Sequence, residues 1–297
     1  IRVAAGQGGG GMSVRRKILI HILALIALVW TVVPIVWIVL ISLMYHHEFA
    51  SADIHLFPHQ PTLANYVRLL GGDAPDWNGA PQGPNAYGPL IRQGLLNSAE
   101  VAVWVTVLSM IVAVPAAYAL SRVQMRFRQA GLLTIVATRS IPPVATTIPF
   151  FALYQGLGLS GTKTGLVIAH MTITVPLLVW IGTSFFGGLP PGLERMARVD
   201  GCSRWLAFAR VVVPASRNSM TAMAVIAFIT SWDEFTFALI FNTGTPAQTF
   251  PPALSSMFFQ VSVPTDVASA TVLGLIPPLL VAGLFQRYIR KVNLVGL

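Results

Sequence analysis

Six long apolar stretches recur along the chain, and this repetition constrains the fold more than any other feature. A helix of about 20 residues is long enough to cross the roughly 30 Å hydrocarbon core of a bilayer. The predicted spans are residues 18–44, 101–120, 132–154, 166–186, 220–241 and 267–285. Only 10% of the residues are charged, whereas soluble domains carry about 25%. The sequence therefore predicts an all-α polytopic membrane protein with six transmembrane helices and excludes a soluble domain.

The distribution of Lys and Arg predicts the orientation of these helices, because basic loops are retained in the cytoplasm. Fourteen basic residues fall on one side of the predicted spans and three on the other, which places both termini in the cytoplasm. The fourteen are Arg15, Arg16, Lys17, Arg122, Arg126, Arg128, Arg195, Arg198, Arg204, Arg210, Arg217, Arg287, Arg290 and Lys291. The three are Arg68, Arg92 and Lys163. The formal net charge of +9 is thus explained by membrane topology, and no nucleic-acid partner is expected.

The segments between the spans differ in length and composition. Residues 1–11 end in four glycines ahead of Met12, and we interpret them as a flexible leader or a scar left by cloning. Residues 12–297 are then one transmembrane domain. Residues 45–93 form a polar external loop rich in Gly and Pro, with one short helix near residues 63–70, and residues 187–217 form a second long loop in the cytoplasm.

The cytoplasmic loop has the pattern of two short helices that meet at a glycine. Apolar and charged residues alternate over 193–199 as in a short amphipathic helix, and Gly201 can end it in a left-handed conformation. Ser203 is a suitable N-cap for a second helix over 204–213. These elements predict a compact knob on the cytoplasmic surface.

The knob resembles the "EAA loop" of binding-protein-dependent ABC importer permeases. The usual pattern is E-A-A-x-x-D-G, an intervening F, and L-P thirteen residues after the glycine. The positions of the pattern are occupied in this chain by Arg195, Met196, Ala197, Asp200, Gly201, Phe208 and Pro214, and Glu194 stands one residue before the first of them. Two positions depart from the pattern, because Arg195 stands where Glu is usual and Met196 where the first Ala is usual. In that family the loop is the coupling helix, which docks into a cleft on the cytoplasmic ATPase subunit.

Other segments extend the resemblance to the MalG-like sugar permeases over nearly the whole chain after Met12. They are Phe57-Pro58, Pro61 to Tyr66, Asn97-Ser98, Ala116 to Arg122, Ile141-Pro142, Ile148-Pro149, Gly156 to Leu159, and Ser231 to Phe235. The resemblance implies the type I importer permease fold, location in the bacterial inner membrane, and carbohydrate uptake. It also implies a second permease, two ATPase subunits that bind ATP and Mg²⁺, and an external solute-binding protein, so this chain itself is not an enzyme and needs no cofactor. Monosaccharides, oligosaccharides, polyols, acidic sugars and glycerol phosphates all remain open as cargo.

Ionisable groups at membrane depth are costly and usually face a bundle interior or a wet cavity. Arg139, Asp233 and Glu234, together with the adjacent Trp232, are therefore candidates for the substrate path. The alternative is that they form internal pairs that fix helix packing. The proline pairs at 142–143 and 277–278 either line a cavity or simply kink their helices.

Several weaker patterns indicate ordinary structural roles. The segment 156–164 resembles a P-loop, but its lysine is displaced by one residue and no strand precedes it. His46 and His47 lack the spacing of a zinc helix, and a single cysteine, Cys202, supports neither a disulfide nor a metal cluster. We expect His21 and His170, which lie in apolar spans, to make packing hydrogen bonds.

Two other classes of protein were weighed. A stand-alone secondary transporter or channel driven by an ion gradient would show inverted repeats and paired broken helices, and the two halves of the sequence show no convincing self-similarity. A membrane-embedded transferase would need an acidic cluster, which Asp200 and Glu194 alone do not make.

Overall fold

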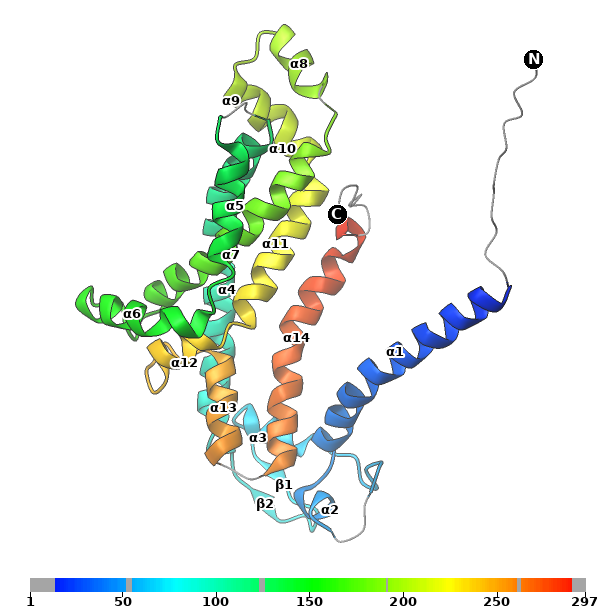
Figure 1. Cartoon of the computed structure of the whole chain (residues 1–297). Helices are drawn as coiled ribbons and strands as arrows, with labels where there is room; N and C mark the ends of the chain where they lie inside the picture. The colour runs from blue at the N-terminus through cyan, green and yellow to red at the C-terminus, as the bar shows by residue number, and fades with distance from the viewer. Residues whose placement is uncertain (1–13, 52–54, 123–125, 191, 261–262, 290–297) are drawn as a thin grey trace.

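The protein is mostly helical, with a bundle of long helices that carries a lobe at one end and a small knob at the other (Figure 1). The computed structural model describes residues 14–51, 55–122, 126–190, 192–260 and 263–289. The predicted leader at residues 1–11 and the basic residues Arg290 and Lys291 lie outside this described part. The described helices and strands are α1 (Val14–Ser42), α2 (His46–Phe49), α3 (Ala64–Leu69), β1 (Ala74–Pro75), β2 (Pro81–Gln82), α4 (Gly88–Arg122), α5 (Arg128–Thr138), α6 (Pro143–Gly156), α7 (Lys163–Gly187), α8 (Gly192–Val199), α9 (Arg204–Ala207), the π-helix η1 (Phe208–Val212), α10 (Val213–Ala215), α11 (Arg217–Trp232), α12 (Thr236–Asn242), α13 (Phe250–Gln260) and α14 (Pro264–Ile289).

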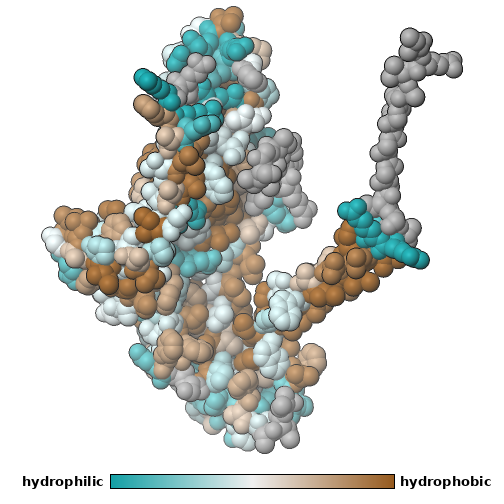
Figure 2. Space-filling model, viewed as in Figure 1, coloured by the Kyte–Doolittle hydropathy of each residue, from teal (hydrophilic) through white to brown (hydrophobic). Residues whose placement is uncertain are grey.

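Four helices in the described residues, α1, α4, α7 and α14, are long and apolar enough to cross a membrane. A fifth span is obtained if the bent pair of segments Arg204–Ala215 and Arg217–Trp232 counts as one. Figure 2 shows a hydrophobic middle region, with hydrophilic surface concentrated on the knob and at the start of α1. The structure thus agrees with a multi-pass helical membrane protein.

The third and fifth predicted spans are each divided into two helices. The span predicted over 132–154 is interrupted between α5 and α6, where Pro142 is extended (φ −59°, ψ 131°) and Pro143 begins the new helix. The span predicted over 220–241 is interrupted between α11 and α12. There the Glu234 carboxylate accepts hydrogen bonds from the backbone N–H groups of Phe237 (2.9 Å) and Ala238 (3.2 Å), so it caps α12 as a separate helix.

The second predicted span begins earlier than expected, at Gly88, so the external loop is shorter than 45–93. The first turns of α4 carry polar residues that hydropathy alone assigns to a loop. Their side chains make buried contacts to α13 and the segment before it: Asn97 Nδ2 donates to the carbonyl oxygens of Pro246 (2.9 Å) and Gln248 (2.8 Å), and Ser98 Oγ accepts from Phe250 N (2.9 Å). These bonds hold the early turns of α4 in helical form.

The lobe is more ordered than the sequence suggests. The predicted short helix is confirmed as α3, but the lobe also contains α2 and an antiparallel two-stranded ladder in which Ala74 is opposite Gln82. The segment 242–266, which separates the fifth and sixth predicted spans, contains α13. Leu69 of α3, Ile91 of α4 and Met257 of α13 are fully buried in a shared cluster, which explains why these short helices form.

The bundle core lies where α4, α7 and α11 meet. Gly182 of α7 permits their close approach, because a Cβ atom there would lie 2.8 Å from Ala117 Cβ and 2.9 Å from Met223 Cε. The buried side chains of this cluster come from Ala113, Val114, Ala117, Leu178, Val179, Phe186, Phe208, Val212, Met223 and Ala227. Because Phe208 and Val212 belong to the knob segment, the knob is anchored in the bundle core.

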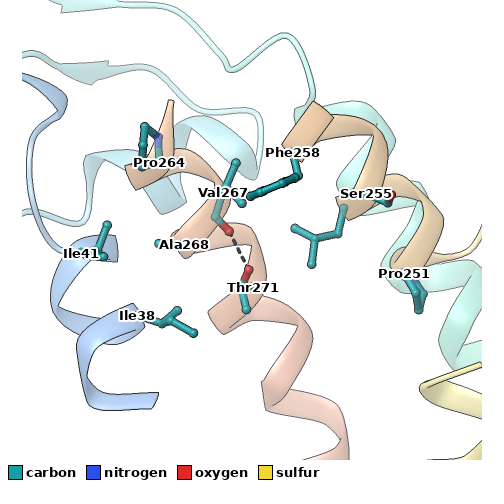
Figure 3. A pocket seen from close by; sticks show the side chains of 10 residues that line it. Ile38, Ile41, Pro251, Ser255, Phe258, Pro264, Val267, Ala268 and Thr271 are labelled. Atoms are coloured by element: carbon teal, nitrogen blue, oxygen red, sulfur yellow. Dashed lines mark hydrogen bonds between the residues drawn. The ribbon is translucent and has the colours of Figure 1, made fainter. Parts of the chain in front are cut away.

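Helix α1 stands apart from the bundle (Figure 1). It approaches α14 only near its C-terminal end, and its most apolar window has no buried residues. Between this end of α1, α13 and α14 lies an apolar cleft of about 670 Å³ (Figure 3). Its lining residues are Ile38, Ile41, Pro251, Leu254, Ser255, Phe258, Pro264, Val267, Ala268 and Thr271.

Candidate functional site

The knob presents a sharply two-sided helix, α8. Ala197 is buried against the rest of the knob, whereas Arg195, Met196, Arg198 and Val199 point outward and are exposed. Met196 is 61% exposed and Val199 87% exposed. An apolar side chain left this bare at the tip of a protein indicates a contact surface.

Gly201 adopts the left-handed conformation predicted for it, with φ +88°. Two backbone hydrogen bonds close the end of α8, from Cys202 N to Ala197 O (3.0 Å) and from Gly201 N to Arg198 O (3.2 Å). This pair of bonds is the Schellman motif. The motif fixes the corner between α8 and the next helix.

The second helix of the knob begins as predicted and runs slightly longer. Ser203 Oγ accepts a hydrogen bond from Leu206 N (3.2 Å), which confirms the predicted N-cap. Residues 204–215 then stay helical through the π-turn η1, instead of ending at 213. Pro214 has no N–H to donate to the carbonyl four residues before it and its ring crowds that carbonyl, so a widened turn ahead of it relieves the clash.

Phe208 holds this second helix to the bundle. Its ring packs on Tyr118 of α4 at 4.5 Å between centroids, and on Trp205 at 5.3 Å. After Ser216 the chain turns by 79° into α11. The corner at Gly201 and the buried Phe208 ring thus connect α8 to α4 and to the start of α11.

Glu194 has an internal role that its place in the sequence did not suggest. Its carboxylate interacts with the Tyr118 hydroxyl, and the charges of Arg122 and Arg204 lie within electrostatic reach of that hydroxyl. Arg122 also donates to the carbonyl oxygen of Leu189 at the entrance to the knob. Arg122 was interpreted from the sequence as a topology signal and as part of the family resemblance, and this anchoring contact was not predicted.

The remaining knob residues lie on the surface. Asp200 and Pro214 are exposed, and Asp200 N donates to Met196 O (3.0 Å). Cys202 is half-buried. The structure thus brings the eight residues named for the coupling loop into one unit. Some of them, such as Arg195 and Met196, face outward, and others, such as Ala197 and Phe208, face the rest of the protein.

The structure divides the four residues proposed for the substrate path into two buried residues, Trp232 and Glu234, and two exposed residues, Asp233 and Arg139. Trp232 is buried and donates from Nε1 to Gly274 O of α14 (3.2 Å). The Glu234 carboxylate is also buried, with Oε2 lying 3.0 Å from His170 Nε2. His170 Nδ1 in turn lies 2.9 Å from Ser231 Oγ, so His170 joins α7 to the end of α11. His170 makes the packing hydrogen bond expected of it, and the partnership with Glu234 was not predicted.

Asp233 and Arg139 are the two candidates that remain exposed. Asp233 lies at the break between α11 and α12, and Arg139 lies at the end of α5, just before the break to α6. Among the described residues, neither has an ion-pair partner within 4.0 Å. The two second halves, α6 and α12, pack together through Tyr154 and Phe241, whose ring centroids are 5.0 Å apart.

One other pattern from the sequence has a structural explanation. Lys163, the lysine of the P-loop-like segment, pairs with the Glu100 carboxylate of α4. In the part of the chain that the structure describes, no group of three or more His, Cys, Asp or Glu residues is arranged to hold a metal ion.

Comparison with known proteins identifies the family of this architecture. The family model described as "Binding-protein-dependent transport system inner membrane component" matches residues 106–292. The sulfoquinovosyl glycerol transport system permease protein SmoH of Agrobacterium fabrum is 33% identical over 271 residues, covering 91% of this chain and 90% of the relative. The trehalose/maltose transport system permease protein MalG of Thermococcus litoralis is 29% identical over 280 residues, covering 93% and 95% of the two chains.

A solved structure shares the fold. A chain of a bacterial ABC transporter involved in the import of the acidic polysaccharide alginate superposes with a TM-score of 0.71 at 21% identity, covering 92% of this chain and 95% of that chain. The overall fold of this chain, from α1 to α14, thus has a solved counterpart.

Proposed function

Because the chain belongs to the family of binding-protein-dependent transport system inner membrane components, we propose that it is a permease subunit of an ATP-driven ABC importer for a carbohydrate. The family match over residues 106–292, which includes the whole knob, carries the proposal. The permeases named above serve sulfoquinovosyl glycerol and trehalose or maltose, and these names support a sugar or sugar derivative as cargo. In this role the chain forms half of a translocation path and catalyses no reaction.

The proposed membrane arrangement has six crossings, with both termini in the cytoplasm of a bacterium. In Figure 1 the knob and the end of α14 point away from the lobe, the start of α1 is the end of that helix farther from the lobe, and all three segments carry basic residues. Basic segments at one end support cytoplasmic placement of that end. Under this arrangement α5–α6 and α11–α12 each serve as one interrupted crossing, and the lobe faces outward.

In the proposed mechanism the knob docks on one of two cytoplasmic ATPase subunits, which bind ATP and Mg²⁺. A second permease completes the path, and an external solute-binding protein delivers the cargo to the outer lobe. Closure of the ATPases pushes on α8, and the Gly201 corner together with Phe208 passes the movement to α4 and α11. The access of the path then alternates between the two sides of the membrane.

The helix breaks supply the proposed polar contacts of the path. Arg139 and Asp233 sit where backbone hydrogen-bond ladders are interrupted and are exposed in the single chain. A guanidinium and a carboxylate can hydrogen-bond to sugar hydroxyls. In this proposal Glu234 and Trp232 do not contact the cargo, and they support the path by holding α12 and α14 in place.

The function is tested by co-expressing the chain with a candidate partner permease, ATPase and binding protein from the same organism and reconstituting the complex in liposomes. We expect uptake of a labelled sugar that requires internal ATP and the sugar-loaded binding protein. Arg139→Gln and Asp233→Asn should lower uptake several-fold while the complex assembles normally. Arg128→Gln, at the exposed opposite end of α5, is the matched control and should leave uptake unchanged. ATP-independent uptake would contradict the proposal.

One observation favours a second candidate, a secondary transporter driven by an ion gradient. Paired broken helices are typical of such proteins, and the described part of the chain has two, α5–α6 and α11–α12. The same liposomes separate the candidates. A secondary transporter would accumulate the sugar with the chain alone under an imposed ion gradient, whereas the importer would not.

A further inference from the structure

The outward face of α8 has a composition that specifies its docking partner. Within this eight-residue helix, Arg195 and Arg198 lie one turn apart on the exposed side, and Met196 and Val199 lie beside them. The face therefore combines two guanidinium groups with two bare apolar side chains.

The acidic residues of the knob do not balance these charges on the docking face. The Glu194 carboxylate is turned toward Tyr118, in the neighbourhood of Arg122 and Arg204. Asp200 is exposed but follows the last turn of α8. Among the described residues, neither Arg195 nor Arg198 has an ion-pair partner within 4.0 Å. The outward face of the helix is thus net positive.

The face is also held rigidly, so its charges have fixed positions. The Schellman motif at Gly201 sets the end of α8, the Ser203 cap sets the start of the next helix, and Phe208 anchors that helix in the core. Figure 1 places α8 at the far tip of the bundle, and Figure 2 shows this tip as largely hydrophilic surface. Such a tip is suited to a protein partner in water and not to burial among lipid tails.

We propose that α8 docks into an acid-rimmed cleft of the ATPase subunit, in which a carboxylate pairs with Arg195 while Met196 and Val199 cover an apolar floor. This inference rests on the proposed function and names the chemistry of the partner surface. A guanidinium recognises a carboxylate through two parallel hydrogen bonds, which lysine cannot reproduce. Arg195 is also one of the two positions at which this chain departs from the E-A-A pattern, so its charge distinguishes the cognate ATPase from those of related importers.

The test measures how much ATPase remains bound to the purified two-permease complex for wild-type chain and for variants. Charge reversal at a paired interface position opposes two like charges, and we expect Arg195→Glu to reduce the retained ATPase by at least about tenfold. Arg195→Lys keeps the charge but loses the paired hydrogen bonds, and should reduce retention less. Arg217→Glu is the matched control, since Arg217 is exposed at the start of α11, beyond the bend, and should retain ATPase as the wild type does.

A reciprocal change completes the test. Replacing the carboxylates that line the ATPase cleft by lysine, one at a time, should restore binding of the Arg195→Glu chain for one position and weaken binding of the wild type at the same position. Retention of the second permease by each variant shows that the chain is folded. If Arg195→Glu fails this check, Arg195→Gln, which removes the charge without reversing it, takes its place and should also lose ATPase.

The outcomes separate the two proposals. A wild-type chain that binds no ATPase contradicts the proposed function itself. Equal ATPase retention by wild type and Arg195→Glu overturns only the acid-rimmed cleft, as does an equal loss with Arg217→Glu, which would reflect bulk charge. Absence of any rescuing carboxylate would likewise overturn it.

Discussion

Gly274 of α14 is a position where a single added methyl group should disturb the structure strongly. A Cβ atom there would lie 2.0 Å from Phe250 Cε1 and 2.3 Å from Phe250 Cζ. The Phe250 ring is buried and stacks on Trp232 at 6.5 Å between centroids, and the Trp232 Nε1 group donates to Gly274 O (3.2 Å). The variant Gly274→Ala therefore disturbs the joint between α11, α13 and α14.

The magnitude follows from the overlap. Carbon atoms in contact prefer a separation of about 3.5–4.0 Å, so the Phe250 ring must retreat by about 1.5 Å. Overpacking of this kind costs about 1–3 kcal/mol, and weakening of the Trp232 hydrogen bond adds about 1 kcal/mol. Alanine gains about 1 kcal/mol over glycine through helix propensity. We expect the free energy of unfolding to fall by about 1–3 kcal/mol.

A double-mutant cycle with Phe250→Ala isolates the clash. In that background the obstacle is gone, so Gly274→Ala should stabilise the protein by up to about 1 kcal/mol. The interaction free energy between the two positions is then about 2–4 kcal/mol. Gly283→Ala in the same helix is the control, because a Cβ atom at Gly283 meets nothing within 4 Å.

The assay is equilibrium unfolding in mixed micelles of rising SDS content, followed by tryptophan fluorescence. The reasoning is refuted if Gly274→Ala is as stable as wild type, or if it has the same effect with and without the Phe250 ring.

Three further predictions follow from other sites. Gly201→Ala should reduce ATPase stimulation by the loaded binding protein, because a left-handed alanine costs about 1–2 kcal/mol; Gly201→Asn should be milder, and equal activity of all three proteins would exclude a role for the corner. His170→Ala should lower the yield of folded protein, because it leaves the buried Glu234 carboxylate without its partner; the double variant with Glu234→Gln should recover part of the yield on size-exclusion chromatography, and no recovery would contradict the pairing. Asn97→Ala removes two buried hydrogen bonds to the segment before α13 and should lower the unfolding free energy by about 1–3 kcal/mol. We expect faster hydrogen exchange that is confined to that segment. Unchanged exchange there would contradict the role of Asn97.

Hydropathy predicted the long helices well and their interruptions poorly. It found α1, α4, α7 and α14, because each is a continuous apolar run. It joined α5 to α6 and α11 to α12, because averaging over a window conceals a proline pair or a single capping carboxylate such as Glu234. Those interruptions depend on local hydrogen bonds, which a sum of transfer free energies does not contain.

The helical content of the polar segments next to the lobe was underestimated for a related reason. The early turns of α4 and the helix α13 are stabilised by contacts distant in sequence, such as that between Ser98 and Phe250. No local sequence pattern predicts these contacts. A hydropathy average, which includes only residues that are neighbours in sequence, therefore assigns both segments to loops.

The knob was predicted more fully, because its signals are local. Gly201 and Ser203 act on neighbouring backbone, and both behave as their types require. The inward turn of Glu194 toward Tyr118 was beyond reach, since it depends on the packing of α4 beside the knob. Which side chains of α8 face outward is likewise a property of the assembled bundle.

The isolation of α1 has a consequence for biosynthesis. Because its apolar window buries nothing against the later helices, its insertion gains almost nothing from their presence. Its first turns carry Arg15, Arg16 and Lys17, which suit the cytoplasmic end of a helix that inserts by itself. The first helix can thus act as an autonomous anchor during translation, holding the nascent chain at the membrane before any other part of the bundle has been made.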